Sequence, residues 1–132
     1  MKPSIVLLAL LAVTACNKSS KDSKDPRELS VLLKGCNTNV FGNDAIKICY
    51  DSLHESRCPI GGYCIWEGVA TGYFSFYINA DKFPVTLSTS NIEPYGIETT
   101  VRNYKIELLN IDPYPGLPSP PPATAKVRIT KL

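Results

Sequence analysis

The stretch Tyr73-Phe74-Ser75-Phe76-Tyr77-Ile78 (residues 73–78) places an apolar side chain at every second position. Successive side chains of a β-strand point to opposite faces of a sheet, so this pattern predicts a strand with one buried face and one face toward solvent. The two phenylalanines and Ile78 belong to the buried face. Tyr73 and Tyr77 form a row on the outer face, where aromatic side chains stabilise sheets through cross-strand pairs and in other proteins bind sugars or peptides.

Five further segments repeat this alternation, and we expect the segment at 73–78 to begin as early as Ile65-Trp66. The five are residues 29–34, 46–51, 83–88, 103–108 and 125–130. Turn-forming residues separate them, and no segment after residue 15 has a helical period over ten or more residues. The proline-rich run 113–122 lacks the N–H donors of a strand and predicts a stiff surface connection. Two sheets packed through their apolar faces would bury all these segments. The sequence therefore predicts an all-β fold: a single antiparallel β-sandwich of about six or seven strands.

Four cysteines lie within the predicted sandwich: Cys36, Cys49, Cys58 and Cys64. An even number of cysteines in an exported chain predicts two disulfides, although four cysteines allow three pairings. We favour Cys58–Cys64, which closes a short loop, and Cys36–Cys49, which would cross a hairpin. A zinc site is the alternative, but the cysteine spacings are unusual for zinc and His54 is poorly placed to complete a ligand set. We expect no metal and no cofactor.

The N-terminal region predicts export and lipid attachment. An apolar run at 5–13 follows Lys2 and is too short for a transmembrane helix, but it fits the core of a secretory signal. The next residues, Val13-Thr14-Ala15-Cys16, resemble the lipobox of bacterial lipoproteins. The resemblance implies cleavage after residue 15 and a lipid on Cys16. Two or more acyl chains at this residue would anchor the protein stably in the membrane. The alternative is an ordinary secretory signal followed by a chance cysteine.

Three regions follow from this interpretation: a signal peptide at 1–15, a lipidated Cys16 with a disordered tether at 16–28, and the β-sandwich at 29–132. Residues 17–28 are rich in lysine, serine and aspartate and offer no apolar face to bury. The chain has 14 basic and 12 acidic residues, so loss of Lys2 leaves 13 against 12. This balance predicts no nucleic-acid partner and no membrane contact beyond the lipid anchor.

The most distinctive motif is Glu55-Ser56-Arg57-Cys58-Pro59, a short loop, and then Cys64-Ile65-Trp66-Glu67-Gly68-Val69-Ala70. It resembles a motif of small exported bacterial proteins and lipoproteins of unknown function: Asp-Ser-Arg-Cys-Pro, a loop, and Cys-hydrophobic-Trp-x-Gly-x-Ala. Members also tend to end in a strand that contains tyrosine before a proline-rich turn, as residues 104–115 do here. This chain has Glu55 in place of the usual aspartate and adds Cys36 and Cys49. The resemblance implies no particular activity.

Physically, the motif predicts a structural corner. The disulfide loop would set Trp66 at the start of a strand, where its ring covers the core. Glu55 and Arg57 would pair as a brace under the loop, and Gly68 and Gly72 indicate a bulge or a close backbone approach. The alternative is an exposed recognition loop, pre-organised by its disulfide and consisting of Pro59, Ile60, Gly61, Gly62 and Tyr63.

No catalytic constellation accompanies these residues. His54 could be oriented by Asp51 or Glu55, but no nucleophile lies in a recognisable context, and we expect no enzyme. We therefore predict a lipid-anchored protein of the bacterial cell envelope, at the outer membrane, that faces the periplasm or the cell surface. Its role would be non-enzymatic: to bind an envelope protein or a carbohydrate, or to support a larger assembly. The alternative is an inhibitor or regulator of an exported hydrolase that acts through the Cys58–Cys64 loop.

Overall fold

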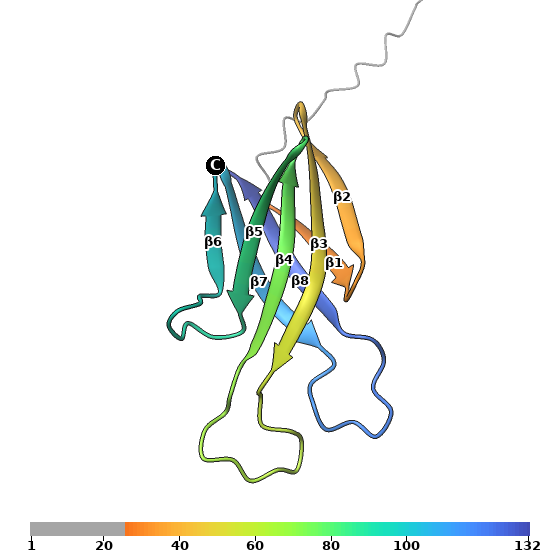
Figure 1. Cartoon of the computed structure of the whole chain (residues 1–132), viewed down its shortest axis with the longest axis vertical. Coiled ribbons are helices and arrows are strands. Elements are labelled where there is room, and N and C mark those ends of the chain that lie inside the picture. Colours follow the sequence, from red (N-terminus) through yellow and green to blue (C-terminus); the bar gives the residue numbers. More distant parts are fainter. Residues whose placement is uncertain (1–25) are drawn as a thin grey trace, which may run out of the picture.

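The computed structural model describes residues 26–132, which form eight β-strands in two antiparallel sheets (Figure 1). One sheet has the strand order β1-β8-β7-β6 and the other the order β2-β3-β4-β5. The predicted fold class, an all-β antiparallel sandwich with two disulfides, is confirmed. The strands are β1 (Arg27–Leu32), β2 (Cys36–Phe41), β3 (Asp44–Glu55), β4 (Ala70–Ile78), β5 (Asp81–Ser88), β6 (Glu98–Val101), β7 (Tyr104–Asp112) and β8 (Thr124–Lys131).

Two strands, β2 and β6, were not expected from the alternation. Both lie at the edge of a sheet, where a strand has one neighbour only. Their sequences, CNTNVF and ETTV, lack an extended run of alternating apolar residues, although Phe41 at the end of β2 is fully buried. The strand predicted to begin at Ile65-Trp66 begins instead at Ala70.

The first strand also starts earlier than expected. Arg27 pairs with Ile129 and Glu28 pairs with Arg128, so β1 includes the last two residues of the predicted tether. The predicted signal peptide, the lipid-attachment residue Cys16 and the tether up to residue 25 lie outside the described residues.

The core lies between the sheets and consists mostly of the predicted inward-facing side chains, together with Phe41 and Ile111 from outside the predicted segments. Phe74, Phe76 and Ile78 are all buried, while Tyr73 and Tyr77 are half-buried on the outer face, as the alternation predicts. Edge-to-face contacts of Tyr104 with Phe41 and Phe76 join the two sheets. Fully buried side chains of this size each contribute about 1.5–3 kcal/mol. The largest are Tyr50, Tyr104, Phe41, Phe76, Ile46, Ile48, Leu87, Ile106, Ile111 and Ile129.

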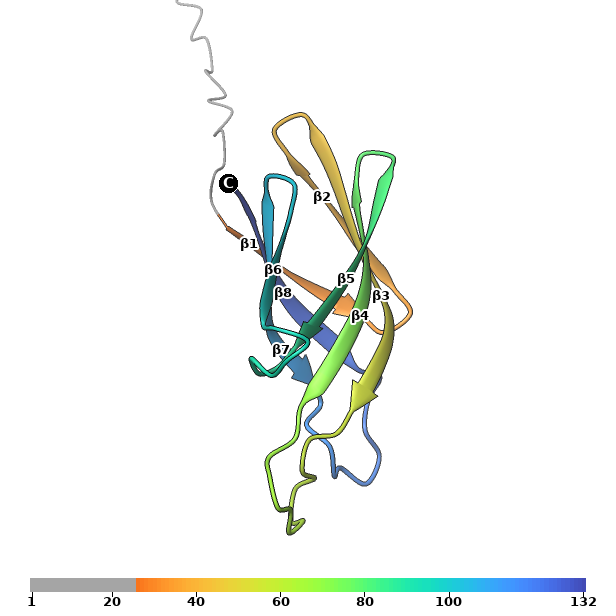
Figure 2. The same cartoon turned by 60° about the vertical axis from the view of Figure 1, so that its left-hand side comes forward.

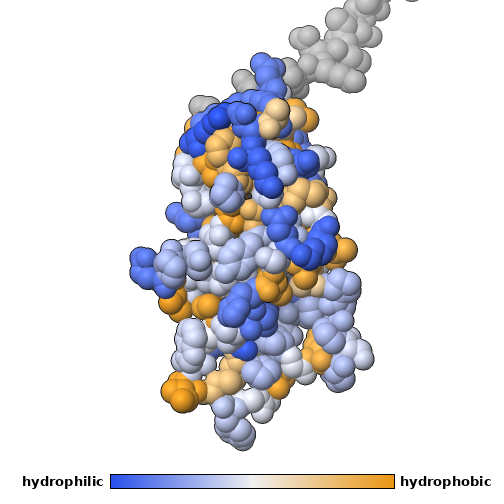
Figure 3. All heavy atoms as spheres, viewed as in Figure 1, coloured by the Kyte–Doolittle hydropathy of each residue, from blue (hydrophilic) through white to orange (hydrophobic). Residues whose placement is uncertain are grey.

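Two long loops lie together at one end of the sandwich. The β3–β4 loop (residues 56–69) and the proline-rich β7–β8 loop (residues 113–123) extend from the lower end in Figures 1 and 2. The chain enters the domain at β1, whose first residue lies toward the opposite end in both views. Figure 3 shows hydrophobic residues exposed around the lower end. The predicted surface connection at 113–122 is confirmed.

The favoured disulfide pairing is present. Cys36–Cys49 joins β2 to β3 with 4.0 Å between the Cα atoms, and Cys58–Cys64 closes a ring within the β3–β4 loop. Stable disulfides indicate an oxidising compartment outside the cytoplasm. Among residues 26–132 there is no helix long and apolar enough to cross a membrane.

Candidate functional site

The β3–β4 loop is a structured extension of the hairpin that it closes. The Ser56 N–H donates to the Val69 carbonyl at 2.9 Å, and the Cys58 N–H donates to the Glu67 carbonyl at 2.7 Å. The Ser56 hydroxyl also donates to the same Val69 carbonyl at 2.7 Å. These bonds continue the β3–β4 pairing toward the disulfide, so the two arms of the loop are held side by side.

A tight turn and the disulfide complete the far end of the loop. The Gly62 N–H donates to the Pro59 carbonyl at 2.9 Å, and Gly61 has a φ of +77°. Glycine with positive φ at the third position allows a turn that a side chain at Gly61 would strain. The Cys58–Cys64 bond closes the ring behind this turn. All residues of the predicted recognition loop, 59–63, are exposed.

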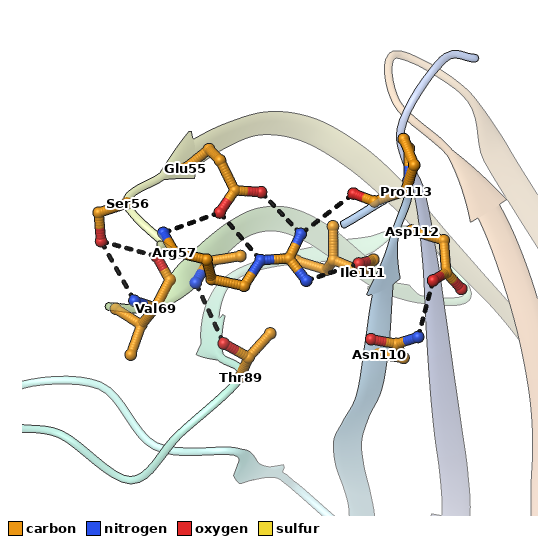
Figure 4. Close-up of polar contacts among 10 residues, drawn as sticks. Glu55, Ser56, Arg57, Val69, Thr89, Asn110, Ile111, Asp112 and Pro113 are labelled. Carbon is orange, nitrogen blue, oxygen red and sulfur yellow. Dashed lines mark hydrogen bonds and ion pairs between the residues drawn. The ribbon is translucent and has the colours of Figure 1, made fainter. Parts of the chain in front are cut away.

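Arg57 and Glu55 form the brace predicted under the loop (Figure 4). The Arg57 Nε donates to Glu55 Oε1 at 2.9 Å, and its Nη2 donates to Glu55 Oε2 at 2.7 Å. The arginine side chain is 6% exposed and that of Glu55 is 28% exposed. This two-point geometry fixes the guanidinium plane, because each nitrogen faces its own carboxylate oxygen.

The same guanidinium reaches the second loop. Its Nη1 donates to the Ile111 carbonyl at 2.9 Å and its Nη2 donates to the Pro113 carbonyl at 3.3 Å. The ring of Tyr114 lies 4.7 Å from the guanidinium carbon, which adds a cation–π contact. Arg57 therefore connects the β3–β4 loop to the end of β7 and the start of the proline-rich loop.

Backbone contacts strengthen this connection. The Ile60 N–H donates to the Pro115 carbonyl at 2.9 Å, so the turn of one loop rests on the other. Gly68, buried and at φ +70°, lies so near the opposite arm that a Cβ there would be 1.8 Å from the Ser56 carbonyl oxygen. The close approach predicted at Gly68 is therefore confirmed. Both loops form one braced unit.

Within this braced unit, the β3–β4 loop exposes four large apolar side chains, which we name the apolar tip: Ile60, Tyr63, Ile65 and Trp66. Tyr63 and Ile65 are fully exposed, and Ile60 is 61% exposed. The prediction that Trp66 covers the core is wrong, because 57% of the residue is exposed. Pairing of β3 with β4 ends at Ala70, so Trp66 lies in the loop, where the strand alternation no longer applies.

A shallow hollow of about 400 Å³ lies within the tip, between the disulfide and the indole. Its lining residues are Cys58, Gly62, Tyr63, Cys64, Ile65, Trp66 and Glu67. The loop's only cation, Arg57, is paired with Glu55, whereas Glu67 is exposed. The tip is therefore apolar with a single acidic margin.

Tyr50 was not singled out by the sequence. It is fully buried and stacks on Phe74 with 4.9 Å between ring centroids, and its hydroxyl has no hydrogen-bond partner among the described residues. The pKa of Tyr50 is raised to about 12, chiefly by burial and in part by the negative charge of Glu55, while Arg57 opposes the shift. The brace thus stands beside a buried, unpaired hydroxyl.

Other residues considered for chemistry are not gathered into a site. His54 is exposed near the end of β3, paired in register with Thr71 on the outer face. Within residues 26–132, no three histidine, cysteine, aspartate or glutamate side chains group together so as to hold a metal ion. The sequence did not predict that Ile65 and Tyr114 take part in this site. The signal that could have indicated the exposure of Ile65 is the nearby Gly68, which interrupts the strand.

No protein-family model matches this chain, and comparison with curated proteins and with solved structures finds no match. The function must therefore be inferred from the site itself.

Proposed function

We propose that this protein is a lipid-anchored, non-enzymatic recognition module of the bacterial cell envelope, and that its apolar tip binds a partner protein. The observation that carries the proposal is the exposure of Tyr63, Ile65 and Trp66 on a loop that the fold holds rigidly. Large apolar groups that a domain fixes in place and leaves in water mark interaction sites.

The tip has the composition of a binding hot spot. Tyrosine and tryptophan dominate the energetics of protein interfaces, especially where surrounding contacts exclude water. The disulfide, the turn at Gly61 and the Arg57 brace limit the conformations of the free loop. Binding therefore costs less conformational entropy than it would for a flexible loop.

The shape and charge of the tip favour a protein cleft as its partner. The tip is narrow, whereas a stable interface buries about 800 Å² on each partner, so the partner must surround the tip. An anionic lipid surface would require unpaired cations, but Arg57 is neutralised by Glu55 and Glu67 adds a negative charge. A concave, largely apolar protein surface satisfies both conditions.

The lipid anchor at Cys16 is part of the proposal. The chain enters the domain at Arg27, toward the end of the sandwich away from the two loops (Figures 1 and 2). Attachment on that side places the tip at the end of the domain opposite the anchor. Replacing Cys16 with serine should release the protein from the membrane fraction; a Cys16→Ser protein that still carries labelled lipid would contradict the anchor.

A second function, inhibition of an exported hydrolase, is favoured by one observation: the tip projects beyond the sandwich as a rigid wedge (Figure 2). Such a wedge could enter an active-site cleft. The two functions differ in outcome, because an inhibitor lowers the activity of the enzyme that it captures and a recognition module does not.

The test uses capture from envelope extracts followed by binding of the purified partner. The double variant Tyr63→Ser/Ile65→Ser removes two apolar tip residues, and Leu32→Ser is the control, since Leu32 is also an exposed apolar side chain (52%) but lies on β1. Truncation of one hot-spot residue costs about 2 kcal/mol or more, so the double variant should bind at least about thirtyfold more weakly. Equal binding by the double variant and the parent would refute the tip as the interface.

A further inference from the structure

We propose that the outer face of the sheet β2-β3-β4-β5 carries a second binding site, for an acidic polysaccharide, centred on Lys47, Tyr77 and Lys82. The observation behind it is a difference between the two outer faces. On the sheet β1-β8-β7-β6 the charges pair with one another: Glu28 bridges Lys126 at 3.1 Å and Arg128 at 2.9 Å, and Lys105 meets Glu98 at 3.6 Å. On that face, each of these charged side chains has a partner of opposite charge.

The opposite face leaves two cations unpaired. Within the described part of the chain, neither Lys47 nor Lys82 forms an ion pair. Both lie in register with Tyr77, Lys47 on one side and Lys82 on the other. Their Nζ atoms lie 4.1 and 5.9 Å from the centroid of its ring. The tyrosine ring therefore holds the ammonium groups of both lysines near it. The Cα atoms of the two lysines are separated by two strand spacings, about 10 Å.

A hollow of about 330 Å³ is bounded by β2, by the start of β3 with Lys47, and by Asn79 in the turn after β4. Its lining combines apolar groups with hydroxyl and amide groups, as a sugar ring requires of its binding surface: Thr38, Asn39, Val40, Ala45, Ile46, Lys47 and Asn79. Val40 is largely exposed and offers an apolar contact for the C–H face of a sugar, while Thr38 offers a hydroxyl.

The hollow and the two lysines form one path across the strands, from β2 to β5. A polymer of uronic acids fits this path, because one sugar can occupy the hollow while carboxylates on other sugars meet Lys47 and Lys82. Figure 3 views this face and shows mostly hydrophilic residues across its middle. The acidic residue Asp51 is also on β3, but its carboxylate is engaged by the Ser75 hydroxyl, which donates a hydrogen bond to it at 2.6 Å.

This site is separate from the apolar tip. Lys47 lies near the start of β3 and Tyr77 near the end of β4, whereas the tip lies between the end of β3 and the start of β4. The polysaccharide site therefore does not depend on the proposed protein partner, and each can fail without the other.

Affinity electrophoresis of the purified full chain tests the site, with polygalacturonate in the gel and its fully methyl-esterified form as the uncharged counterpart. We expect retardation by polygalacturonate that weakens with added salt, and none by the ester. The variant Lys47→Gln/Lys82→Gln should bind about fivefold more weakly, from two exposed charge contacts. The control Lys105→Gln/Lys126→Gln removes the same charge from the opposite sheet and should bind like the parent.

Three results would overturn the proposal. Equal retardation by the ester would show that charge is not recognised. Equal weakening by the two double variants would show a general effect of net charge. Binding to vesicles of phosphatidylglycerol without binding to polygalacturonate would identify a lipid surface instead of a glycan. Thermal unfolding of each variant, which changes only half-buried or exposed residues, verifies that the fold is retained.

Discussion

Replacing Arg57 with methionine tests whether the brace holds the two loops together. Methionine keeps an unbranched side chain of similar reach but removes the guanidinium, which donates four hydrogen bonds: two to Glu55 and one each to the carbonyls of Ile111 and Pro113. The Ile111 residue is 1% exposed, so its carbonyl loses a partner that water cannot easily replace.

The expected cost follows from these environments. Breaking a buried ion pair by removing one partner costs about 3–5 kcal/mol. The low end applies here, because the Glu55 side chain is 28% exposed and can regain water. We therefore expect Arg57→Met to lose about 3 kcal/mol of unfolding free energy, a large share of the total for a domain of this size. The midpoint of thermal unfolding should fall by roughly 10–20 °C.

The measurement is urea unfolding followed by the fluorescence of Trp66, the single tryptophan, together with limited proteolysis of the β3–β4 loop. The matched control is Arg102→Met, because Arg102 and its partner Asp81 are 53% and 59% exposed. Such a pair contributes about 0–1 kcal/mol. If Arg57→Met and Arg102→Met cost the same, and the loop resists protease equally in both, the brace does not anchor the tip.

Two further predictions concern the residues around the brace. Tyr50→Phe removes a buried hydroxyl without a partner among the described residues and should raise the unfolding free energy by about 1 kcal/mol; a loss of stability would show that the hydroxyl is satisfied. Because burial raises the pKa of Tyr50 to about 12, the folded state holds this proton more tightly than the unfolded state. This tighter proton binding affects the free energy of unfolding: its effect is constant below pH 10, and stability is lost as the pH rises toward 12. The loss of stability with rising alkaline pH, monitored by circular dichroism, should therefore be less steep in Tyr50→Phe. Gly68→Ala should lower the unfolding free energy by more than about 2 kcal/mol, since the new Cβ would lie 1.8 Å from a backbone oxygen. Gly61→Ala has open space around its Cβ and should lower the unfolding free energy by only about 1 kcal/mol, because of its positive φ. Equal midpoints for these two glycine variants in urea would contradict the close approach.

The fold was predictable because a single physical rule governs most of it. Side chains alternate across a strand, so residues 73–78 could be assigned to a core face and an outer face without knowledge of the partners. The rule failed at the edge strands β2 and β6, whose mostly polar sequences show no sustained alternation even though Phe41 of β2 is fully buried. The cysteine pairing followed from loop length and a presumed hairpin, both of which are local.

The site was predictable only in part. The pairing of Glu55 with Arg57 was accessible because the two residues are neighbours in sequence. The contacts of Arg57 with Ile111, Pro113 and Tyr114 were not, since they join residues more than fifty positions apart and depend on how the sheets pack. Trp66 was assigned to the core because apolar residues are usually buried, and the strand was extended through Gly68. The positive φ of that glycine ends the regular pairing and leaves the indole outside.

The cost of this arrangement supports its functional interpretation. Leaving Tyr63, Ile65 and Trp66 in water forgoes about 1.5–3 kcal/mol for each side chain that a core could have buried. The fold also removes Arg57 from water and commits it to positioning the loop, although a buried ion pair contributes little net stability compared with apolar packing. Neither feature improves the folded domain on its own. Both become favourable when the tip is covered by a partner, because the exposed apolar area is then buried and the loop needs no further ordering. The apolar area that the free domain leaves exposed thus sets an upper limit on what its burial can add to affinity, because association also costs translational and rotational freedom.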